Sequence, residues 1–115
     1  MRKIFLTLTY MVGLFLTQQL SAFADGSVTY KLTIKDGVFT PPSIIVPTHK
    51  RIRIEVKNIG TSPAEFENLS LIVEKTLGAD VGSVAVIPPL RPGQYKFIDE
   101  FHPNMAGFLI TAKDQ

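Results

Sequence analysis

The residues best able to do chemistry are concentrated in one short segment, residues 95–107, which reads Y-K-F-I-D-E-F-H-P-N-M-A-G. It carries two acids, an imidazole and a thioether: Asp99, Glu100, His102 and Met105. Carboxylate oxygen, imidazole nitrogen and thioether sulfur are all ligands of transition metals. The segment therefore predicts a metal site in the turn after an aromatic strand, and the other segments must supply the scaffold that holds it.

Each of these four side chains also has an ordinary structural role that the sequence leaves open. By strand alternation Asp99 faces the interior with Phe101 and the other aromatic residues, where a lone carboxylate is costly unless it is paired or bound to metal. The alternative is that Asp99 caps the following turn through its side chain. The alternatives for the others are a surface turn residue for His102, a core residue for Met105 and a solvated edge charge for Glu100.

A second group of acids lies in A-E-F-E at residues 64–67, with Glu74 a few residues beyond. If Phe66 belongs to the core, Glu65 and Glu67 both point to the opposite face of a strand. Either the strand then begins after Glu65, or one of the two glutamates is merely solvated. Glu65, Glu67 and Glu74 are therefore candidate carboxylate ligands whose alternative is a solvated surface charge.

The N-terminal segment has the three parts of a secretory signal peptide. Two basic residues give a charged start, residues 4–16 are mostly apolar, and residues 22–24 form a small-x-small cleavage site, A-F-A. Because the apolar run is shorter than the roughly 20 residues needed to span a bilayer, an uncleaved anchor is the weaker alternative. We expect residues 1–24 to be a signal peptide and residues 25–115 to be one domain that functions in the periplasm.

The charge of the chain does not indicate a nucleic-acid partner. The chain has 12 Lys and Arg against 10 Asp and Glu, and Arg2 and Lys3 of the expected signal peptide account for the whole excess. Residues 25–115 are therefore balanced in charge, without the basic run typical of nucleic-acid binding. The chain also has no cysteine, so an exported domain of this size must fold on packing and strand pairing without a disulfide.

Hydrophobic alternation predicts an all-β domain. Residues 28–35 and 51–57 alternate apolar and polar side chains with period two, the second most cleanly, as R-I-R-I-E-V-K. Strands are also expected over residues 94–101 and 107–112, whereas residues 69–77 leave strand and short helical turn undecided. About six to eight short strands separated by Gly- and Pro-containing turns favour a mostly antiparallel sandwich or barrel.

Four motifs are spread along the predicted domain, each occurring once. They are F-T-P-P-S-I-I-V-P, A-E-F-E, P-L-R-P-G-Q-Y-K-F and D-E-F-H-P, which begin at residues 39, 64, 89 and 99. Together they resemble the small cupredoxin-like proteins of the EfeO type, over nearly all of residues 28–113. The resemblance implies a cupredoxin-like Greek-key β-sandwich in a bacterial iron-uptake system. It also implies partners, namely a membrane iron permease and other periplasmic iron-uptake proteins.

The same resemblance implies roles for individual residues. Glu65 stands where the EfeO-type domain has a metal-binding glutamate, Asp99 where it has a metal-linked residue, and Met105 matches the weak axial methionine of cupredoxins. Ala64 follows Pro63 where the first histidine ligand of a blue-copper protein would stand, and there is no cysteine. Without a thiolate, a blue-copper site cannot form.

We therefore expect a metal-binding protein that is not an electron carrier of the blue-copper kind. Carboxylates with one imidazole suit iron or Cu(II), which would serve iron delivery or the oxidation of Fe(II). The sequence has no Ser-His pairing at recognisable spacing and no Gly-rich phosphate loop, so a hydrolytic enzyme is not indicated. The alternative function is a metal-free β-sandwich interaction module or partner subunit, and a homodimer formed through a sheet edge stays open.

Overall fold

The computed structural model describes residues 27–115, so the expected signal peptide and its cleavage site lie outside the described residues. The strands are β1 (Val28–Lys35), β2 (Val38–Thr40), β3 (Ser43–Pro47), β4 (Ile52–Asn58), β5 (Ala64–Asn68), β6 (Val73–Leu77), β7 (Gly82–Ile87), β8 (Gly93–Phe97) and β9 (Phe108–Lys113). The predicted all-β fold is confirmed, with nine strands in the described residues where six to eight were expected. Within the same residues, no helix is long and apolar enough to cross a membrane.

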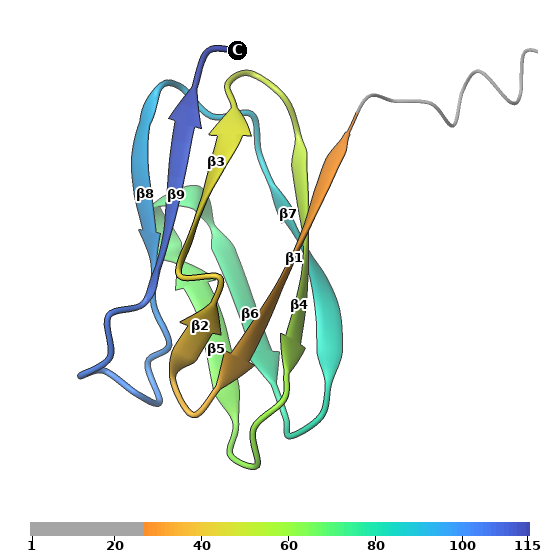
Figure 1. The fold of residues 1–115 in the computed structure, drawn as a ribbon, viewed down its shortest axis with the longest axis vertical. Helices are drawn as coiled ribbons and strands as arrows, with labels where there is room; N and C mark the ends of the chain where they lie inside the picture. Colours follow the sequence, from red (N-terminus) through yellow and green to blue (C-terminus); the bar gives the residue numbers. More distant parts are fainter. Residues whose placement is uncertain (1–26) are drawn as a thin grey trace, which may run out of the picture.

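The strands form a two-layer sandwich, which Figure 1 shows with β3, β8 and β9 on one side and β1, β4 and β7 on the other. The first layer is the sheet β2-β1-β4-β7. The second layer contains the sheet β3-β9-β8 and the two-stranded sheet β5-β6, joined by an isolated antiparallel bridge between Glu67 and Ile98. The β1–β4 and β3–β9 pairs are parallel and the other strand pairs are antiparallel, so the sheets are mostly antiparallel, as predicted.

Alternation along the strands decides what is buried. In β4 the apolar side chains of Ile52, Ile54 and Val56 lie in the core, while the charged side chains between them are exposed. This is the pattern of a sheet with one face on the core and the other in water. The prediction from R-I-R-I-E-V-K is therefore confirmed.

Four phenylalanines form the aromatic part of the core and hold β5 in place. Phe66 of β5 stacks on Phe97 of β8 with ring centroids 4.4 Å apart and an interplanar angle of 10°. Phe39 and Phe108 contact Phe66 with centroids 6.3 and 5.9 Å away. All four side chains are buried, and each buries a large apolar area. The residues on either side of Phe66 therefore have positions that the core determines.

The strand before the predicted metal site is shorter than the sequence suggested. β8 ends at Phe97 rather than at residue 101, because the chain turns at Asp99, whose carbonyl accepts a hydrogen bond from the backbone N–H of His102 at 3.0 Å. The prediction that Phe101 faces the interior was wrong, since this side chain lies in the turn and is 51% exposed.

The undecided segment, residues 69–77, contains both of the elements considered. A 3-10 helix, Leu69–Leu71, is followed by β6. The side chain of Asn68 accepts a hydrogen bond from the backbone N–H of Leu71 at 3.0 Å and so caps the helical turn. Ile72 joins the two elements with φ 57°, a left-handed conformation that is unusual for a β-branched residue.

Asn58 fixes the loop that leads from β4 into β5. Its Nδ2 donates to the carbonyls of Ser62, Leu77 and Gly78 at 2.8, 3.1 and 3.1 Å, and its Oδ1 accepts from the N–H of Gly60 at 3.0 Å. The side chain is fully buried, so these bonds satisfy all of its polar atoms. Asn58 thereby ties the start of β5 to the end of β6.

We expect Asn58→Ala to lower the free energy of unfolding by about 2–4 kcal/mol, because it leaves several buried backbone groups without partners. Urea denaturation followed by far-ultraviolet circular dichroism measures the change. Asn104→Ala, in the exposed turn before β9, is the control and should differ from wild type by less than about 0.5 kcal/mol. Equal losses in the two variants would contradict this role for Asn58.

Candidate metal centre

Three of the predicted carboxylate ligands converge at one point. One carboxylate oxygen from each of Glu65, Glu67 and Glu100 lies within 4.8 Å of the other two. Glu65 and Glu67 leave β5 on the same face, because side chains alternate along a strand and Phe66 between them points into the core. Glu100 comes from the turn after β8. We call these three side chains the carboxylate centre.

The bridge between Glu67 and Ile98 explains why these acids meet. The N–H of Glu67 donates to the carbonyl of Ile98 at 3.2 Å, and the N–H of Ile98 donates back to the carbonyl of Glu67 at 3.0 Å. Because the pairing is antiparallel, residue 100 comes opposite residue 65. The segment after β8 thus lies beside β5, and Lys96, Ile98 and Glu100 line a common hollow with Glu67 on the side of β5 that points away from the core.

This arrangement differs from both alternatives that the sequence offered for Glu65 and Glu67. β5 begins at Ala64, so Glu65 lies within the strand. Neither glutamate is merely solvated, since Glu65 is partly buried and Glu67 is only 4% exposed. Strand alternation was correct, but the outward face of β5 is covered by another segment.

The carboxylate centre brings together three acids, of which Glu67 is buried, Glu65 is partly buried and Glu100 is exposed. The Oε2 atoms of Glu65 and Glu67 are buried and have no hydrogen-bond partner. Burial raises the pKa of Glu67, and the charge of Glu100, a hydrogen bond with the Glu65 side chain, and the charges of Glu65 and Glu74 raise it further. Among residues 27–115, no Lys or Arg forms an ion pair with any of the three acids. A cation bound between them would supply the missing opposite charge.

Glu74 lies beside the carboxylate centre but is not one of the three converging acids. It is the cross-strand partner of Glu67 in the β5–β6 register and is exposed. Its contribution in the structure is electrostatic, because its charge adds to the rise in the pKa of Glu67. Its role as a ligand stays a prediction.

A hollow of about 260 Å³ lies against the carboxylate centre. It is lined by Glu67, Asn68, Leu69, Ser70, Lys96, Ile98 and Glu100. Three large apolar side chains, Leu69, Ile72 and Ile98, are exposed along these segments, and Ile72 is 92% exposed. We call them the apolar rim. Leu69 and Ile98 line the hollow and Ile72 follows shortly after Ser70, and exposed apolar side chains grouped in this way are typical of a contact surface.

Asp99 is the centre of a hydrogen-bond network. It is 3% exposed, as its predicted inward direction requires. Its Oδ1 accepts from the backbone N–H of Glu65 at 3.1 Å and of Phe101 at 3.0 Å, and its Oδ2 lies 3.0 Å from Nδ1 of His102. The bond to Phe101 is the turn-capping role that the sequence left open. Asp99 therefore positions both the strand that carries Glu65 and the turn that carries Glu100.

His102 is oriented by its contact with Asp99. When a carboxylate holds one ring nitrogen of a histidine, the ring orientation is fixed and the other nitrogen is left to bind a metal. Here Nδ1 is held, so Nε2 is the candidate ligand atom. His102, Met105 and Glu100 line a hollow of about 360 Å³, and Met105 is partly exposed at its edge.

Gly37 is a residue of this site that the sequence analysis did not single out. A Cβ atom at position 37 would lie 2.5 Å from Cβ of His102 and 2.7 Å from Cγ of Met105. Gly37 also has φ 83°, which favours glycine. The hairpin between β1 and β2 thus packs directly under the turn that carries His102. The Asp36-Gly37 pair was visible as a turn signal, but its contact across the fold was not.

The seven predicted ligands therefore fall into two neighbouring groups. Glu65, Glu67 and Glu100 form the carboxylate centre with Glu74 beside it, and Asp99, His102 and Met105 lie in the following turn. Glu100 lines both hollows. The carboxylate centre offers only oxygen atoms, which suit hard cations, whereas His102 and Met105 offer nitrogen and sulfur, which suit copper.

A two-layer β-sandwich with such a turn between its last two strands places the protein among the cupredoxin-like domains. The chain matches the model of the cupredoxin-like domain over residues 6–111, and it belongs to that family. A protein of Rickettsia prowazekii (strain Madrid E), named "Uncharacterized protein RP394", is 34% identical over 88 residues, which are 76% of this chain and 70% of that protein.

Two solved structures show the same fold at low sequence identity. One is the metal binding domain of the Cu(I) exporting P-type ATPase CopA of Streptococcus pneumoniae D39 with Cu(I), with TM-score 0.66, 16% identity and coverage of 76% of this chain and 87% of that chain. The other is reduced auracyanin from Roseiflexus castenholzii, with TM-score 0.60, 14% identity and coverage of 76% and 96%. The cupredoxin-like fold is confirmed, and the EfeO type stays a prediction. Because the chain has no cysteine, it has no blue-copper site.

We predict that the metal-free protein loses stability as the pH rises from mildly acidic to neutral. The raised pKa of Glu67 means that the folded protein holds this proton more tightly than the unfolded chain does. The resulting stabilisation is fully present below the unfolded pKa and is lost as the pH rises through the folded pKa. Glu67→Gln should therefore flatten the pH profile and be more stable than wild type at neutral pH, as measured by urea denaturation in the presence of a chelator.

The control for this measurement is Glu55→Gln, because Glu55 is exposed and forms its ion pair with Lys31 on the other layer. This variant should keep the wild-type slope of stability against pH. If wild type and Glu67→Gln gave parallel profiles, burial of an ionised Glu67 would not be a source of instability.

We predict that Asp99→Ala weakens metal binding at the carboxylate centre by about 10- to 100-fold, the usual effect of removing a residue that positions ligands. The backbone at Glu65 and Phe101 loses its acceptor, so β5 and the turn no longer hold their acids together. Isothermal titration calorimetry measures the affinity. His102→Ala is the matched variant and should keep the affinity of the carboxylate centre within about threefold; equal losses in both variants would show that Asp99 does not act through Glu65.

Proposed function

We propose that this cupredoxin-like protein binds a hard metal cation through Glu65, Glu67 and Glu100. The observation that carries the proposal is the convergence of three carboxylates within 4.8 Å, with two of their oxygens buried and unpaired. Burying such oxygens without a partner costs free energy, and a bound cation removes that cost. All-oxygen ligand sets favour iron in its higher oxidation state, manganese or calcium over Cu(I) or zinc.

The biological role that we propose is iron uptake on the periplasmic side of the membrane. The EfeO-type motifs and the signal peptide expected over residues 1–24 support this role, and the hard ligand set is compatible with iron. A membrane iron permease or another periplasmic iron-uptake protein would then receive the cation. The apolar rim of Leu69, Ile72 and Ile98 supports such an encounter, because it borders the carboxylate centre and is exposed.

Copper at His102 is a second candidate, and the contact between Asp99 and His102 favours it. His102 and Met105 line the same hollow, and the CopA metal binding domain described above was solved with Cu(I). Nε2 of His102 and the sulfur of Met105 would hold Cu(II) at this position, and the ion would supply one-electron redox chemistry for the oxidation of Fe(II) beside the carboxylate centre.

We expect metal binding at the carboxylate centre to raise the melting temperature. A ligand at about 100 times its Kd stabilises the folded state by about 2.7 kcal/mol. Differential scanning fluorimetry with Fe(III)-citrate, Mn(II), Ca(II) and Cu(II) should show a shift that Glu67→Gln loses and Glu55→Gln keeps. A Cu(II) absorption band that is weak, never intensely blue, and absent in His102→Ala would locate copper at the second position.

The alternative to a metal role is an interaction module that uses the apolar rim alone. In that case no cation would shift the melting temperature of the wild-type protein, and Glu67→Gln would bind every metal as wild type does. A further possibility is a homodimer formed through the apolar rim, which sedimentation equilibrium would detect. Leu69→Ser combined with Ile72→Ser would disrupt such a dimer.

A further inference from the structure

The outer face of the sheet β2-β1-β4-β7 collects positive charge. Side chains that alternate with the buried residues of β1 and β4 point away from the core. Those that carry positive charge are Lys31, Lys35, Arg53 and Lys57. We call them the cationic face. The only acid on the same two strands is Glu55, so this face is cationic although residues 25–115 as a whole are balanced.

The strand register makes this concentration of charge tolerable. Arg53 lies opposite Thr29, Lys31 opposite Glu55, and Lys57 opposite Thr33. No two of these cations are therefore direct cross-strand neighbours. Like charges placed directly opposite each other would destabilise the sheet. Lys31 is instead the diagonal cross-strand neighbour of both Arg53 and Lys57, and diagonal neighbours are about 7–8 Å apart, close to the Debye length of about 8 Å at physiological ionic strength. The potentials of the four cations consequently add.

Two ion pairs reduce this charge only in part. Lys31 lies 3.7 Å from Glu55 and Lys57 lies 3.4 Å from Asp80. All four side chains are largely in solvent, with Lys31 82% exposed, and exposed pairs of this kind are weak. They leave Lys31 and Lys57 able to exchange their partners for the charges of another surface.

The carboxylate centre lies on the opposite side of the molecule. Glu65 and Glu67 point away from the core on the second layer, and Glu74 and Glu100 lie beside them. The aromatic core around Phe66 separates these four acids, which we call the acidic side, from the cationic face. Lys75 and Lys96 also belong to the second layer, so the charge of the acidic side is partly balanced, whereas cations outnumber acids on the cationic face.

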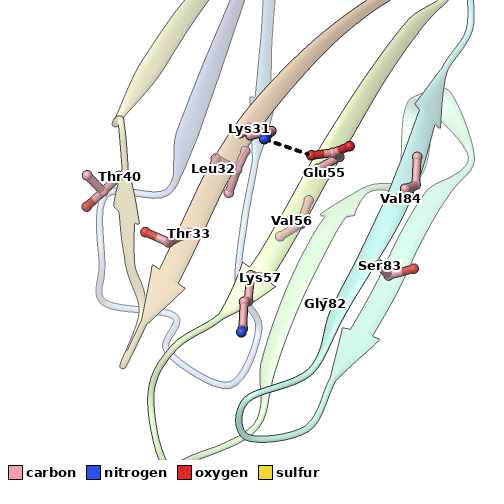
Figure 2. A pocket seen from close by; sticks show the side chains of 10 residues that line it. All are labelled: Lys31, Leu32, Thr33, Thr40, Glu55, Val56, Lys57, Gly82, Ser83 and Val84. Carbon is pink, nitrogen blue, oxygen red and sulfur yellow. Dashed lines mark ion pairs between the residues drawn. The ribbon is translucent and has the colours of Figure 1, made fainter.

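The cationic face is broad, shallow and partly apolar. Figure 2 shows Lys31, Glu55 and Lys57 rising from β1 and β4, with Val84 beside them on β7. A shallow hollow of about 530 Å³ lies over this region, where Gly82 and Ser83 contribute little or no side chain. Val86, also on β7 and directly opposite Arg53, is exposed. Cations and exposed valines therefore share one surface.

We propose that this face docks on the surface of an anionic phospholipid bilayer. Lipid phosphates supply the negative charge that Lys31, Lys35, Arg53 and Lys57 lack, and attraction of this kind acts within a Debye length of the membrane. The valines of β7 meet the boundary between headgroups and acyl chains. An extended sheet face matches a planar partner, and the outward residues of β1, β4 and β7 include no aromatic side chain on which a nucleic-acid base could stack.

Docking in this orientation leaves the carboxylate centre on the side facing away from the membrane. Cations arriving from the surrounding solution then reach Glu65, Glu67 and Glu100 without obstruction from the lipid. The docking uses the cations of β1 and β4 and the valines of β7, none of which belongs to the carboxylate centre, so it holds or fails independently of metal binding.

Co-sedimentation with vesicles tests the proposal. One set of vesicles contains phosphatidylcholine alone and the other contains phosphatidylcholine mixed with phosphatidylglycerol. Residues 1–24 are the same in every preparation, so any binding through them is common to all. We expect binding to the anionic vesicles to exceed binding to the neutral ones by at least roughly tenfold at low salt, and to fall as salt is raised toward physiological strength.

Charge-reversal variants show which face is used. Arg53→Glu combined with Lys57→Glu should reduce binding to the anionic vesicles by at least roughly tenfold. Lys113→Glu combined with Lys96→Glu makes the same change in net charge on the other layer and should retain more than half of the binding. Lys31→Gln, which removes a charge without reversing it, gives a smaller loss and serves if the double variant does not fold, as judged by circular dichroism.

Three results would overturn the proposal. The first is equal binding to neutral and anionic vesicles. The second is equal loss in the two double variants, which would show that net charge matters and the cationic face does not. The third is salt-sensitive self-association without vesicles and no vesicle binding, which would mean that the cationic face meets the acidic side of another copy.

Discussion

The pairing of Glu67 with Ile98 is the contact on which the candidate site depends. Without it, β5 would have one face on the aromatic core and the other in water, and its glutamates would be ordinary surface charges. With it, the segment after β8 runs alongside β5, places side chains next to Glu67 and brings Glu100 to the same place. One short strand then carries a core phenylalanine on one side and buried carboxylates on the other.

Asp99 makes this arrangement rigid. Its two oxygens are used by the backbone of Glu65, the backbone of Phe101 and the ring of His102. A buried carboxylate that accepts several hydrogen bonds is stabilised where an isolated one would not be. Glu65 and Glu67 differ from Asp99, because each has a buried Oε2 atom without a hydrogen-bond partner. Asp99 therefore organises the site, whereas Glu65 and Glu67 are its candidate ligands.

The chain keeps the scaffold of the cupredoxin-like family with a different set of candidate ligand atoms. The β-sandwich and the turn before the last strand are present. The thiolate of a blue-copper site is absent, and three glutamates from β5 and the turn converge next to His102 instead. A rigid sandwich can hold different chemistry at the end of its strands because the core, and not the ligands, supplies the stability of the fold.

The sequence by itself determined the fold class and supplied the candidate ligands. Period-two alternation in residues 28–35 and 51–57 was sufficient to predict these two strands, because one face of each strand is buried against the core. The absence of cysteine was sufficient to exclude blue copper, and A-E-F-E with D-E-F-H-P identified the acids and the imidazole. Only the tertiary structure decided how they are grouped.

Local alternation specifies on which face of a strand a side chain lies, but not what covers that face. The bridge to Ile98 buried Glu67, the turn at Asp99 exposed Phe101, and the hairpin at Gly37 packed under His102. The same reason applies to the cationic face, because the overall balance of Lys and Arg against Asp and Glu does not specify which sheet carries these residues. These features come from contacts between segments far apart in the chain, which no window of neighbouring residues contains.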